Sequence, residues 1–374
     1  MTSRAGGLGE TLHAFDLSLE ALTQLVAEMG EPPYRARQVY RWLYVSLAED
    51  FAQMTDLPKG LRARLQERLA LNRLHPRARL RSASRQAEKV LFELPDGETL
   101  EAVLMRYRKR LTACVSSQVG CPIACPFCAT GQSGFSRNLS AGEMVEQVVY
   151  FERVARARQS RRAEGQRVQP AHQLTNAVWM GMGEPLLNYD AVLEAVRRLA
   201  DPQGFGFSPR RVTLSTVGVV PGILRLMTEN LPVNLAVSLH AATDALRERL
   251  VPLNRRYPLG MLMDACRTYV EGTGRRVSFE YALMDGVNDA PRQARELADL
   301  LEGLLCHVNL IPLNPVEGCA FAGSRREVAL AFAGVLRSRG IPVTVRLRRG
   351  LDIEAGCGQL RRRTQAAPAG RAER

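Results

Sequence analysis

The central part of the chain alternates between short apolar runs and longer segments with helical periodicity. Between residues 112 and 350, seven runs have the length and the β-branched content of strands. Near-continuous apolar strands separated by helices are typical of a parallel sheet that helices cover. The predicted strands are TACVSS, NAVWMGMGEP, RVTLSTVG, VNLAVSLHA, RVSFEYALM, HVNLIPLNP and PVTVRLRRG, and the predicted helices lie around 141–156, 189–200, 221–230, 259–272, 291–304 and 326–339.

Seven repeats are too few for a complete eightfold barrel and too many for a single mononucleotide-binding half. We therefore expect an α/β fold, a partial (β/α)6-type barrel whose ligands gather at the carboxyl ends of its strands. The polar residues agree with this expectation because they come where predicted strands end, which indicates one site at one rim. They are the cysteine-rich loop after the first strand, GMGEPLLN after the second, Ser215, Ser238, His240 and Asn314.

The first part of the chain has another pattern. Residues 16–70 carry two apolar stripes at helical spacing, separated by Gly30. From residue 89 to 105, two strand-like runs flank the turn PDGE, which predicts a β-hairpin. We therefore divide the chain into a helical N-terminal accessory domain (1–80), a hairpin bridge (81–110), a core domain (111–360) and a disordered basic tail (361–374).

The charge balance adds a candidate partner. Lys and Arg number 51 against 38 Asp and Glu, a net charge of +13, and such a surplus attracts polyanions through the release of counterions. A nucleic acid is the expected partner, and the helical domain 1–80 is a candidate contact. The Arg-rich stretch 155–173 is expected to be a disordered insertion, with a basic arm that touches RNA as the alternative. The Arg content of a GC-rich genome would produce the same surplus.

Membrane and secretory roles find no support in the sequence. No run approaches the roughly 18 apolar residues of a membrane span. The opening residues lack the apolar stretch of a secretory signal, so we expect a cytoplasmic protein with reduced thiols. Eight cysteines in 374 residues are also too sparse for a disulfide scaffold.

Three of the cysteines lie close together in the run GCPIACPFCATG. The Cys-x3-Cys-x2-Cys spacing of Cys121, Cys125 and Cys128 supplies three thiolates, one fewer than a closed zinc or iron–sulfur site takes. An open position on a [4Fe-4S] cluster can chelate S-adenosylmethionine (SAM), and reduction then produces a 5′-deoxyadenosyl radical. A closed zinc site with Cys114 as its fourth ligand is the alternative on spacing alone.

Several motifs in order along the chain resemble one family. From about Glu101 to Leu360, the runs ACVSSQVGC, CPFCATGQ, GMGEPLLN, SLHA, HVNLIPLNP and RGLDIEAGCGQL are similar to the RlmN/Cfr family of radical SAM RNA methyltransferases, most of all to its RlmN branch. The resemblance implies methylation of adenine C2 in 23S rRNA, in the peptidyl-transferase region, and in tRNA beside the anticodon. It implies one [4Fe-4S] cluster, two SAM molecules per turnover, an electron donor such as flavodoxin or ferredoxin, a thiol reductant and a monomer.

The resemblance also assigns residue roles. Cys357 resembles the carrier that becomes S-methylcysteine, Cys114 the thiol that resolves the RNA adduct through a transient disulfide with Cys357, and Glu101 the proton acceptor. The chain departs from the family at Gly356, where alanine is common, and we expect the change to be tolerated. The positions that resemble cluster ligands are Cys121, Cys125 and Cys128, and those that resemble SAM contacts are Gly183, Glu184, Ser215, Ser238, Leu239, His240 and Asn314.

Three alternatives share part of this pattern. Cfr-type methylation at adenine C8 would use the same residues. A noncatalytic RNA-binding iron–sulfur protein would have no need of Cys114 and Cys357, and an activase that makes a glycyl radical would not explain the positive charge. The other cysteines have no motif around them, so we expect Cys266 and Cys306 to be small buried residues and Cys319 to be an incidental loop residue.

Overall fold

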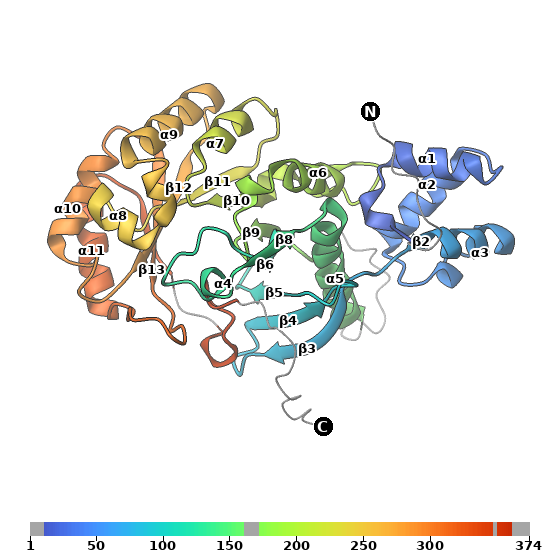
Figure 1. Ribbon diagram of the computed structural model, residues 1–374, viewed down its shortest axis with the longest axis horizontal. Helices are drawn as coiled ribbons and strands as arrows, with labels where there is room; N and C mark the ends of the chain where they lie inside the picture. Colours follow the sequence, from blue (N-terminus) through green and yellow to red (C-terminus); the bar gives the residue numbers. More distant parts are fainter. Residues whose placement is uncertain (1–10, 161–171, 347–349, 361–374) are drawn as a thin grey trace.

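The fold is built on one long mixed sheet (Figure 1). A computed structural model describes residues 11–160, 172–346 and 350–360. In this part of the chain the largest sheet has ten strands, in the order β14-β13-β12-β11-β10-β9-β6-β5-β4-β3. The strands from β6 to β14 run parallel, whereas β3, β4 and β5 are antiparallel to their neighbours.

All seven predicted core strands are present, and the partial α/β barrel is confirmed. The seventh strand is short and pairs only with β13 in the described residues, so six strands form the wall and one lies at its edge. Their bounds are β6 (Leu111–Cys114), β9 (Asn176–Trp179), β10 (Val212–Thr216), β11 (Asn234–Ser238), β12 (Val277–Leu283), β13 (Cys306–Pro312) and β14 (Val343–Val345).

The six predicted core helices are also present, and a seventh, α8, was not predicted because its run DALRERL is mostly charged. None of the helices in the described ranges is long and apolar enough to cross a membrane. The helices are α5 (Ala141–Ser160), α6 (Tyr189–Ala200), α7 (Val220–Met227), α8 (Asp244–Leu250), α9 (Leu259–Thr273), α10 (Pro291–Leu300) and α11 (Arg326–Ser338).

The two faces of the parallel sheet differ in polarity because side chains alternate along each strand. On the outer face, Trp179 and Phe279 are almost fully buried. On the inner face, Ser238 of β11 lies opposite Glu280 of β12, and Glu280 lies opposite Asn309 of β13. The wall of the barrel therefore buries apolar residues outside and presents polar groups inside.

The predicted hairpin is present, but it extends the main sheet. Strands β4 (Ala87–Glu93) and β5 (Thr99–Arg106) form it, and β5 pairs with β6 of the barrel. A third strand, β3 (His75–Arg81), lies inside the region expected to be helical. All seven of its residues are exposed. Because no face of this strand is buried, its sequence lacks the alternation of apolar and polar residues from which a strand is predicted. Arginines and a proline are typical of such an edge strand.

The start of the chain is mostly helical, as expected. Helices α1 (Leu19–Glu28), α2 (Tyr34–Arg41) and α3 (Lys59–Arg68) pack together, and the short strands β1 (Leu12–His13) and β2 (Leu69–Ala70) pair in parallel. The Ser18 hydroxyl caps α1 by accepting the Ala21 N–H at 3.1 Å.

The Arg-rich stretch 155–173 is not disordered throughout. Its first residues form the last turns of α5, where the Arg156 Nε lies 2.9 Å from Glu152 Oε1. A pair at this spacing stabilises a helix. The expectation of disorder was therefore wrong for residues 155–160. Residues 161–171 and the predicted tail 361–374 lie outside the described residues.

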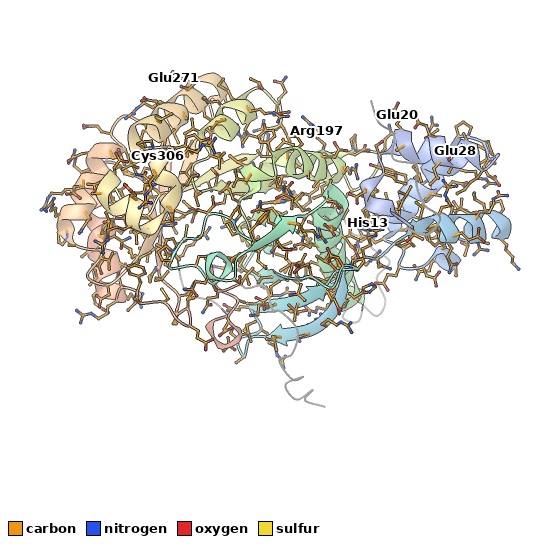
Figure 2. All side chains as sticks on the ribbon, viewed as in Figure 1. His13, Glu20, Glu28, Arg197, Glu271 and Cys306 are labelled. Atoms are coloured by element: carbon orange, nitrogen blue, oxygen red, sulfur yellow. The ribbon has the colours of Figure 1, made fainter. Side chains whose placement is uncertain are left out.

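One buried histidine joins the N-terminal helices to the core. The Nε2 of His13 lies 3.0 Å from Glu146 Oε2 of α5, and its Nδ1 lies 3.5 Å from Asp16 Oδ2. Figure 2 shows His13 between the N-terminal region and the barrel. Burial by itself would lower the pKa of His13, but its contacts with Asp16 and Glu146 outweigh burial and raise the pKa to about 9. The protonated imidazole therefore acts as a buried cation at this junction.

This ion pair predicts a stability that depends on pH. The pKa of His13 is raised in the fold, so its contribution is complete below the ordinary pKa and is lost as pH rises through about 9. The loss is at most about 3 kcal/mol of unfolding free energy. Denaturant titrations at pH 6 and pH 10 would measure it, and His13→Gln should show a much smaller difference between the two. An equal difference in both proteins would contradict the assignment.

Candidate active site

The clustered cysteines lie in a loop that a small sheet closes. Strands β7 (Gln118–Gly120) and β8 (Phe135–Asn138) pair antiparallel on either side of it, and the Cys121 N–H donates to Gly134 O at 3.0 Å. Gly120 has a φ of +77°, and a Cβ there would lie 1.8 Å from that same oxygen. Only glycine permits this close approach. The short helix α4 (Ala129–Gln132) follows directly after the third cysteine.

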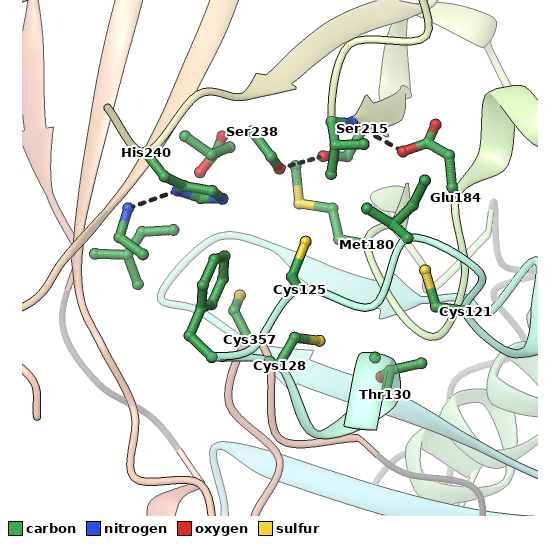
Figure 3. Close-up of a pocket in the computed structure, with 18 of the residues that line it drawn as sticks. Cys121, Cys125, Cys128, Thr130, Met180, Glu184, Ser215, Ser238, His240 and Cys357 are labelled. Carbon is green, nitrogen blue, oxygen red and sulfur yellow. Dashed lines mark hydrogen bonds between the residues drawn. The ribbon is translucent and has the colours of Figure 1, made fainter. Parts of the chain in front are cut away.

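The loop covers one pocket at the carboxyl ends of the barrel strands (Figure 3). The cavity has a volume of about 160 Å³. Ten candidates from distant parts of the sequence line it, so the structure brings them to a single site. They are Cys121, Cys125, Cys128, Gly183, Glu184, Ser215, Ser238, His240, Asn314 and Cys357.

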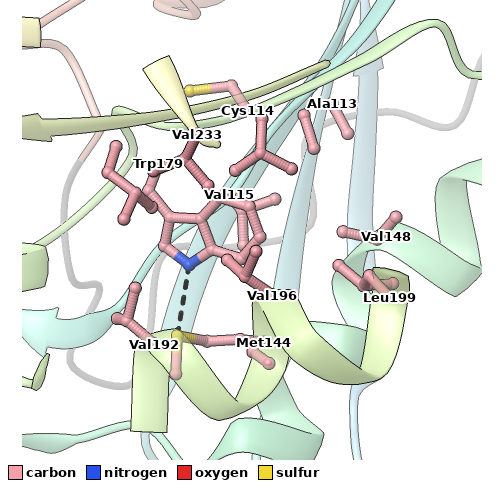
Figure 4. Close-up of a cluster of buried hydrophobic side chains, with 14 of the residues drawn as sticks. Ala113, Cys114, Val115, Met144, Val148, Trp179, Val192, Val196, Leu199 and Val233 are labelled. Atoms are coloured by element: carbon pink, nitrogen blue, oxygen red, sulfur yellow. Dashed lines mark hydrogen bonds between the residues drawn. The ribbon is translucent and has the colours of Figure 1, made fainter. Parts of the chain in front are cut away.

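Three candidates lie outside the lining of this pocket. Leu239 is fully buried, and its N–H donates to Glu280 O at 2.9 Å. Cys114 is buried at the end of β6 beside the core cluster that contains Trp179 (Figure 4). It lies opposite Val178, the residue before Trp179, so its side chain is on the other face of the sheet from Trp179. Its strand pairs with β5, where Val103 lies opposite Cys114. Glu101, two residues from Val103, shares that inner face and is a diagonal neighbour of Cys114.

The three loop thiols do not converge on a point as the ligands of a single zinc ion do. Within the described ranges, no three His, Cys, Asp or Glu side chains are placed to hold one metal ion. Because Cys114 also lies outside the pocket lining, the closed zinc site is not supported. A four-iron cluster instead holds each cysteine on a separate iron. Burial raises the pKa of Cys121 to about 12 and that of Cys125 well above its ordinary value, so bound metal must displace the thiol protons.

Glu184 supplies a buried carboxyl group to the pocket. It is 2% exposed. Its Oε1 accepts the Leu186 N–H at 3.0 Å, and its Oε2 accepts the Val217 N–H at 2.8 Å. Burial raises the pKa of Glu184 to about 7, although these backbone hydrogen bonds oppose the rise. A nearby cation would strongly stabilise the charged form of such a buried carboxyl group.

His240 and Asn314 present polar groups in fixed orientations. The His240 Nδ1 accepts the Ala282 N–H at 3.0 Å, and burial lowers the pKa of His240 to about 3. The ring is therefore neutral and serves as a hydrogen-bonding group. Asn314 donates from Nδ2 to Cys357 O at 3.1 Å, while its buried Oδ1 has no partner among the described residues. That oxygen is available to a donor on a bound molecule.

The end of the described chain brings Cys357 to the cysteine loop. The Ala129 N–H donates to Gly358 O at 2.8 Å, and the Thr130 hydroxyl donates to Leu360 O at 2.6 Å. The Cys357 residue as a whole is exposed, whereas its side chain lines the pocket. Desolvation raises the pKa of its thiol, and Arg346 opposes the rise.

Cys114 lies within electrostatic reach of Cys357. Burial raises the pKa of Cys114 to about 12, and the charge of Cys357 raises it further. Arg346 opposes this rise at Cys114 as it does at Cys357. The two thiols thus share one neighbouring guanidinium.

Sequence reasoning missed several residues that organise the site. Gln118 accepts the Glu184 N–H at 2.8 Å. Arg247 is 1% exposed and donates to Leu239 O at 3.1 Å and to Val217 O, which joins the loops after β10 and β11. In a chain with this many arginines, the sequence around Arg247 does not mark it as a buried residue of the site. Glu280 could have been found, because a charged residue inside an apolar strand run is unusual.

Comparisons with known proteins identify the family. Residues 13–71 match the ribosomal RNA large subunit methyltransferase N-terminal domain, and residues 115–298 match the radical SAM superfamily. A probable dual-specificity RNA methyltransferase RlmN of Chloroflexus aurantiacus is 51% identical over 352 residues, which cover 92% of each chain. Its counterpart in Moorella thermoacetica is 49% identical over 91% of this chain and 95% of that one. The chain belongs to the RlmN family.

A solved relative supports the same conclusion for the fold. The crystal structure of a radical SAM methyltransferase from Sphaerobacter thermophilus is 52% identical, has a TM-score of 0.88, and covers 93% of this chain and 99% of that chain. The resemblance drawn from the motifs is therefore confirmed. Members of the radical SAM family use a [4Fe-4S] cluster and SAM, so these are the cofactors of this enzyme.

Two glycines in the pocket lining and beside it predict different responses to alanine. Gly183 has a φ of +100°, and a Cβ there would lie 2.6 Å from Gln118 Cβ. We expect Gly183→Ala to lower the unfolding free energy by about 1–3 kcal/mol through strain and overlap. At Gly356 a Cβ would lie 2.5 Å from Asn314 Nδ2 and 2.7 Å from Gln359 Oε1. Gly356 has no positive φ, and the atoms in the way are the ends of two side chains, so Gly356→Ala should cost less than Gly183→Ala, about 1 kcal/mol. Denaturant titration would compare the two variants, and equal losses would contradict the prediction.

Proposed function

We propose that this enzyme methylates C2 of one adenine in 23S rRNA, in the peptidyl-transferase region, and of one adenine beside the anticodon in tRNA. The observation that carries the proposal is the placement of Cys357 and Cys114. One thiol lines the pocket under the cysteine loop, and the other lies close by on the inner face of β6. The relatives are named dual-specificity RNA methyltransferases. The net charge of +13 suits an RNA substrate.

The chemistry of C2 explains why two additional thiols are needed. C2 of adenine has no nucleophilic lone pair, so polar transfer from the electrophilic methyl group of SAM cannot reach it. A radical route through a carrier can. When bound, the [4Fe-4S] cluster and SAM supply a 5′-deoxyadenosyl radical.

The pocket residues suit these cofactors. We propose that Cys121, Cys125 and Cys128 hold the cluster and that Glu184 binds the amino group of SAM, for which its buried carboxyl is suited. Asn314 contributes the oxygen that lacks a partner in the described structure. We assign further SAM contacts to Gly183, Ser215, Ser238, Leu239 and His240. Leu239 does not line the pocket, so we assign it the indirect role of placing its neighbours Ser238 and His240.

Cys357 is proposed as the methyl carrier. A thiolate at this position can accept a methyl group on sulfur, and Arg346 favours the thiolate over the thiol. The Asn314 amide holds the backbone of Cys357 at 3.1 Å. The carrier sulfur therefore faces the pocket with its backbone held in place.

We propose that the product is released at the inner face of β5 and β6, where Glu101 and Cys114 lie. Glu101 takes up the C2 proton. Cys114 then forms a disulfide with Cys357 as the methylated RNA leaves. An electron donor such as flavodoxin or ferredoxin and a thiol reductant would complete the cycle. We propose that the enzyme works as a monomer in the cytoplasm, where its RNA substrates are.

The N-terminal part is proposed to bind RNA. Residues 13–71 match a domain of a ribosomal RNA methyltransferase, and β3 exposes all seven of its residues, HPRARLR. The arginines of this strand pair with Glu88 and Glu93, but their side chains are largely exposed and can meet phosphates. We propose 1–80 as the accessory RNA-binding domain, 81–110 as the bridge, 111–360 as the core and 361–374 as a basic tail.

Product analysis tests the function directly. After anaerobic reconstitution with iron and sulfide, the enzyme should convert adenosine in a 23S rRNA fragment to 2-methyladenosine, detected by mass spectrometry. Cys357→Ala should make none. Cys266→Ala, which changes a buried cysteine of the outer helix α9, is the matched control and should remain active.

Each other product would assign another reaction. Mainly 8-methyladenosine would show the Cfr-type reaction. Bound iron without any methylated RNA would favour the noncatalytic protein. If SAM were consumed without label entering RNA, an activase would be favoured.

The pKa of Glu184 predicts how SAM binding depends on pH. Because this pKa is raised to about 7, a proton competes with the amino group of SAM at lower pH. Between pH 6 and pH 7.5, SAM affinity should rise several-fold, by up to about tenfold. Equilibrium dialysis would measure the rise, and Glu184→Gln should bind more weakly and keep only the slope of the SAM amino group itself. The same slope in both proteins would contradict the assignment.

A further inference from the structure

A buried lysine lies beside the proposed proton acceptor. Lys89 of β4 has a side chain that is 2% exposed, and its Nζ lies 3.2 Å from Oε1 of Glu101, which is 1% exposed. Lysine is almost never buried to this degree without a partner, because its ammonium loses the solvation of water. The ion pair thus places two opposite charges together in a buried site.

The sheet register places this ion pair in the same layer as the resolving thiol. Lys89 lies opposite Val103 of β5, and Val103 lies opposite Cys114 of β6. Side chains opposite one another in neighbouring strands share a face. Glu101, two residues before Val103, shares it too. The ammonium, the carboxylate and the thiol thus occupy one inner surface.

The same ammonium holds the segment that carries Cys357. The Lys89 Nζ donates to Glu354 O at 3.1 Å. Glu354 has a φ of +50°, a left-handed conformation that is rare in residues other than glycine. In the same segment, Asp352 Oδ2 accepts the Ala83 N–H at 2.7 Å. The hairpin region is therefore bonded to the carrier segment at two places.

We propose that Lys89 is a positioning residue that acts through Glu101, an inference that rests on the proposed function. The ammonium lies 3.2 Å from the carboxylate and supplies the opposite charge while the carrier segment is docked. An opposite charge at this distance stabilises a buried charged base. With the cation present, the proton of C2 passes to the carboxylate, which becomes a neutral acid. The electron pair of the broken C–H bond stays on the adenine adduct.

This role separates two halves of the reaction. Neither Lys89 nor Glu101 lines the pocket that the cysteine loop covers. Without the ammonium, the carrier segment still keeps its bonds to Ala83, Ala129 and Thr130. Methyl loading of Cys357 and formation of 5′-deoxyadenosine should therefore proceed. Breakdown of the covalent RNA adduct should require it.

Lys89→Met tests the proposal in the reconstituted full chain, because methionine retains the length of the side chain without the charge. Methyl loading of Cys357 and 5′-deoxyadenosine should stay within about twofold of the wild type, while release of methylated RNA should fall by about 100-fold, a typical loss for a proton transfer. Covalent protein–RNA adduct should accumulate on a denaturing gel. Lys89→Arg should restore part of the release.

Glu88→Gln is the matched control. Glu88 is the neighbouring residue on β4, is 3% exposed and pairs with arginines on the opposite face of the strand. Its variant should release RNA normally and shows the effect of removing a buried charge alone.

A double-variant cycle tests whether Lys89 acts through Glu101. If it does, adding Lys89→Met to Glu101→Gln should slow release no further, since coupled residues are not additive. Fully multiplicative effects would overturn the proposal. So would a wild-type release rate in Lys89→Met, or a loss of methyl loading in step with the loss of release. Failure of the proposed function would look different, because the wild type itself would then form neither adduct nor methylated RNA.

Discussion

The docking of the C-terminal segment onto the cysteine loop is the interaction on which the site depends. Two hydrogen bonds join them, from the Ala129 N–H to Gly358 O at 2.8 Å and from the Thr130 hydroxyl to Leu360 O at 2.6 Å. The second spans 230 positions of the sequence. Because both acceptors are backbone carbonyls within three residues of Cys357, the bonds hold the Cys357 thiol where the loop faces the barrel. The groups that would bind the cofactors and the thiol that would use them are therefore parts of one assembly.

The inner face of the main sheet concentrates charged groups where water is scarce. Glu184 has a pKa of about 7 because of burial, and the Lys89–Glu101 pair is almost fully enclosed. In such surroundings a charge persists only beside a partner. The outer face of the same strands buries apolar side chains against the helices, and this burial stabilises the fold. The apolar burial on the outer face therefore supplies the stability of the fold that the buried charges on the inner face do not provide.

Periodicity predicted the elements whose buried positions carry a regular set of apolar residues and missed the elements without that pattern. The core strands and six core helices followed from apolar patterns, whereas β3 exposes every residue and α8 is mostly charged. Motif spacing and strand ends also found ten of the residues that line the pocket. Lys89 and Arg247 could not be found this way, because in a chain with 51 Lys and Arg a single cation has no distinguishing context. Their importance comes from burial, which depends on distant segments.

The sequence by itself determined the available chemistry and the local geometry. Three cysteines within eight residues must share a loop, and alternating strands and helices must form a parallel sheet. Only the tertiary structure decided which distant groups meet. Cys114 is seven residues from the loop and was a possible zinc ligand on spacing, yet strand pairing turns it to the inner face, near Cys357 and beside Glu101. The spacing of residues along the chain limits the distances between side chains only within one loop. Between distant segments, these distances are set by the register of paired strands and by the docking of one segment on another.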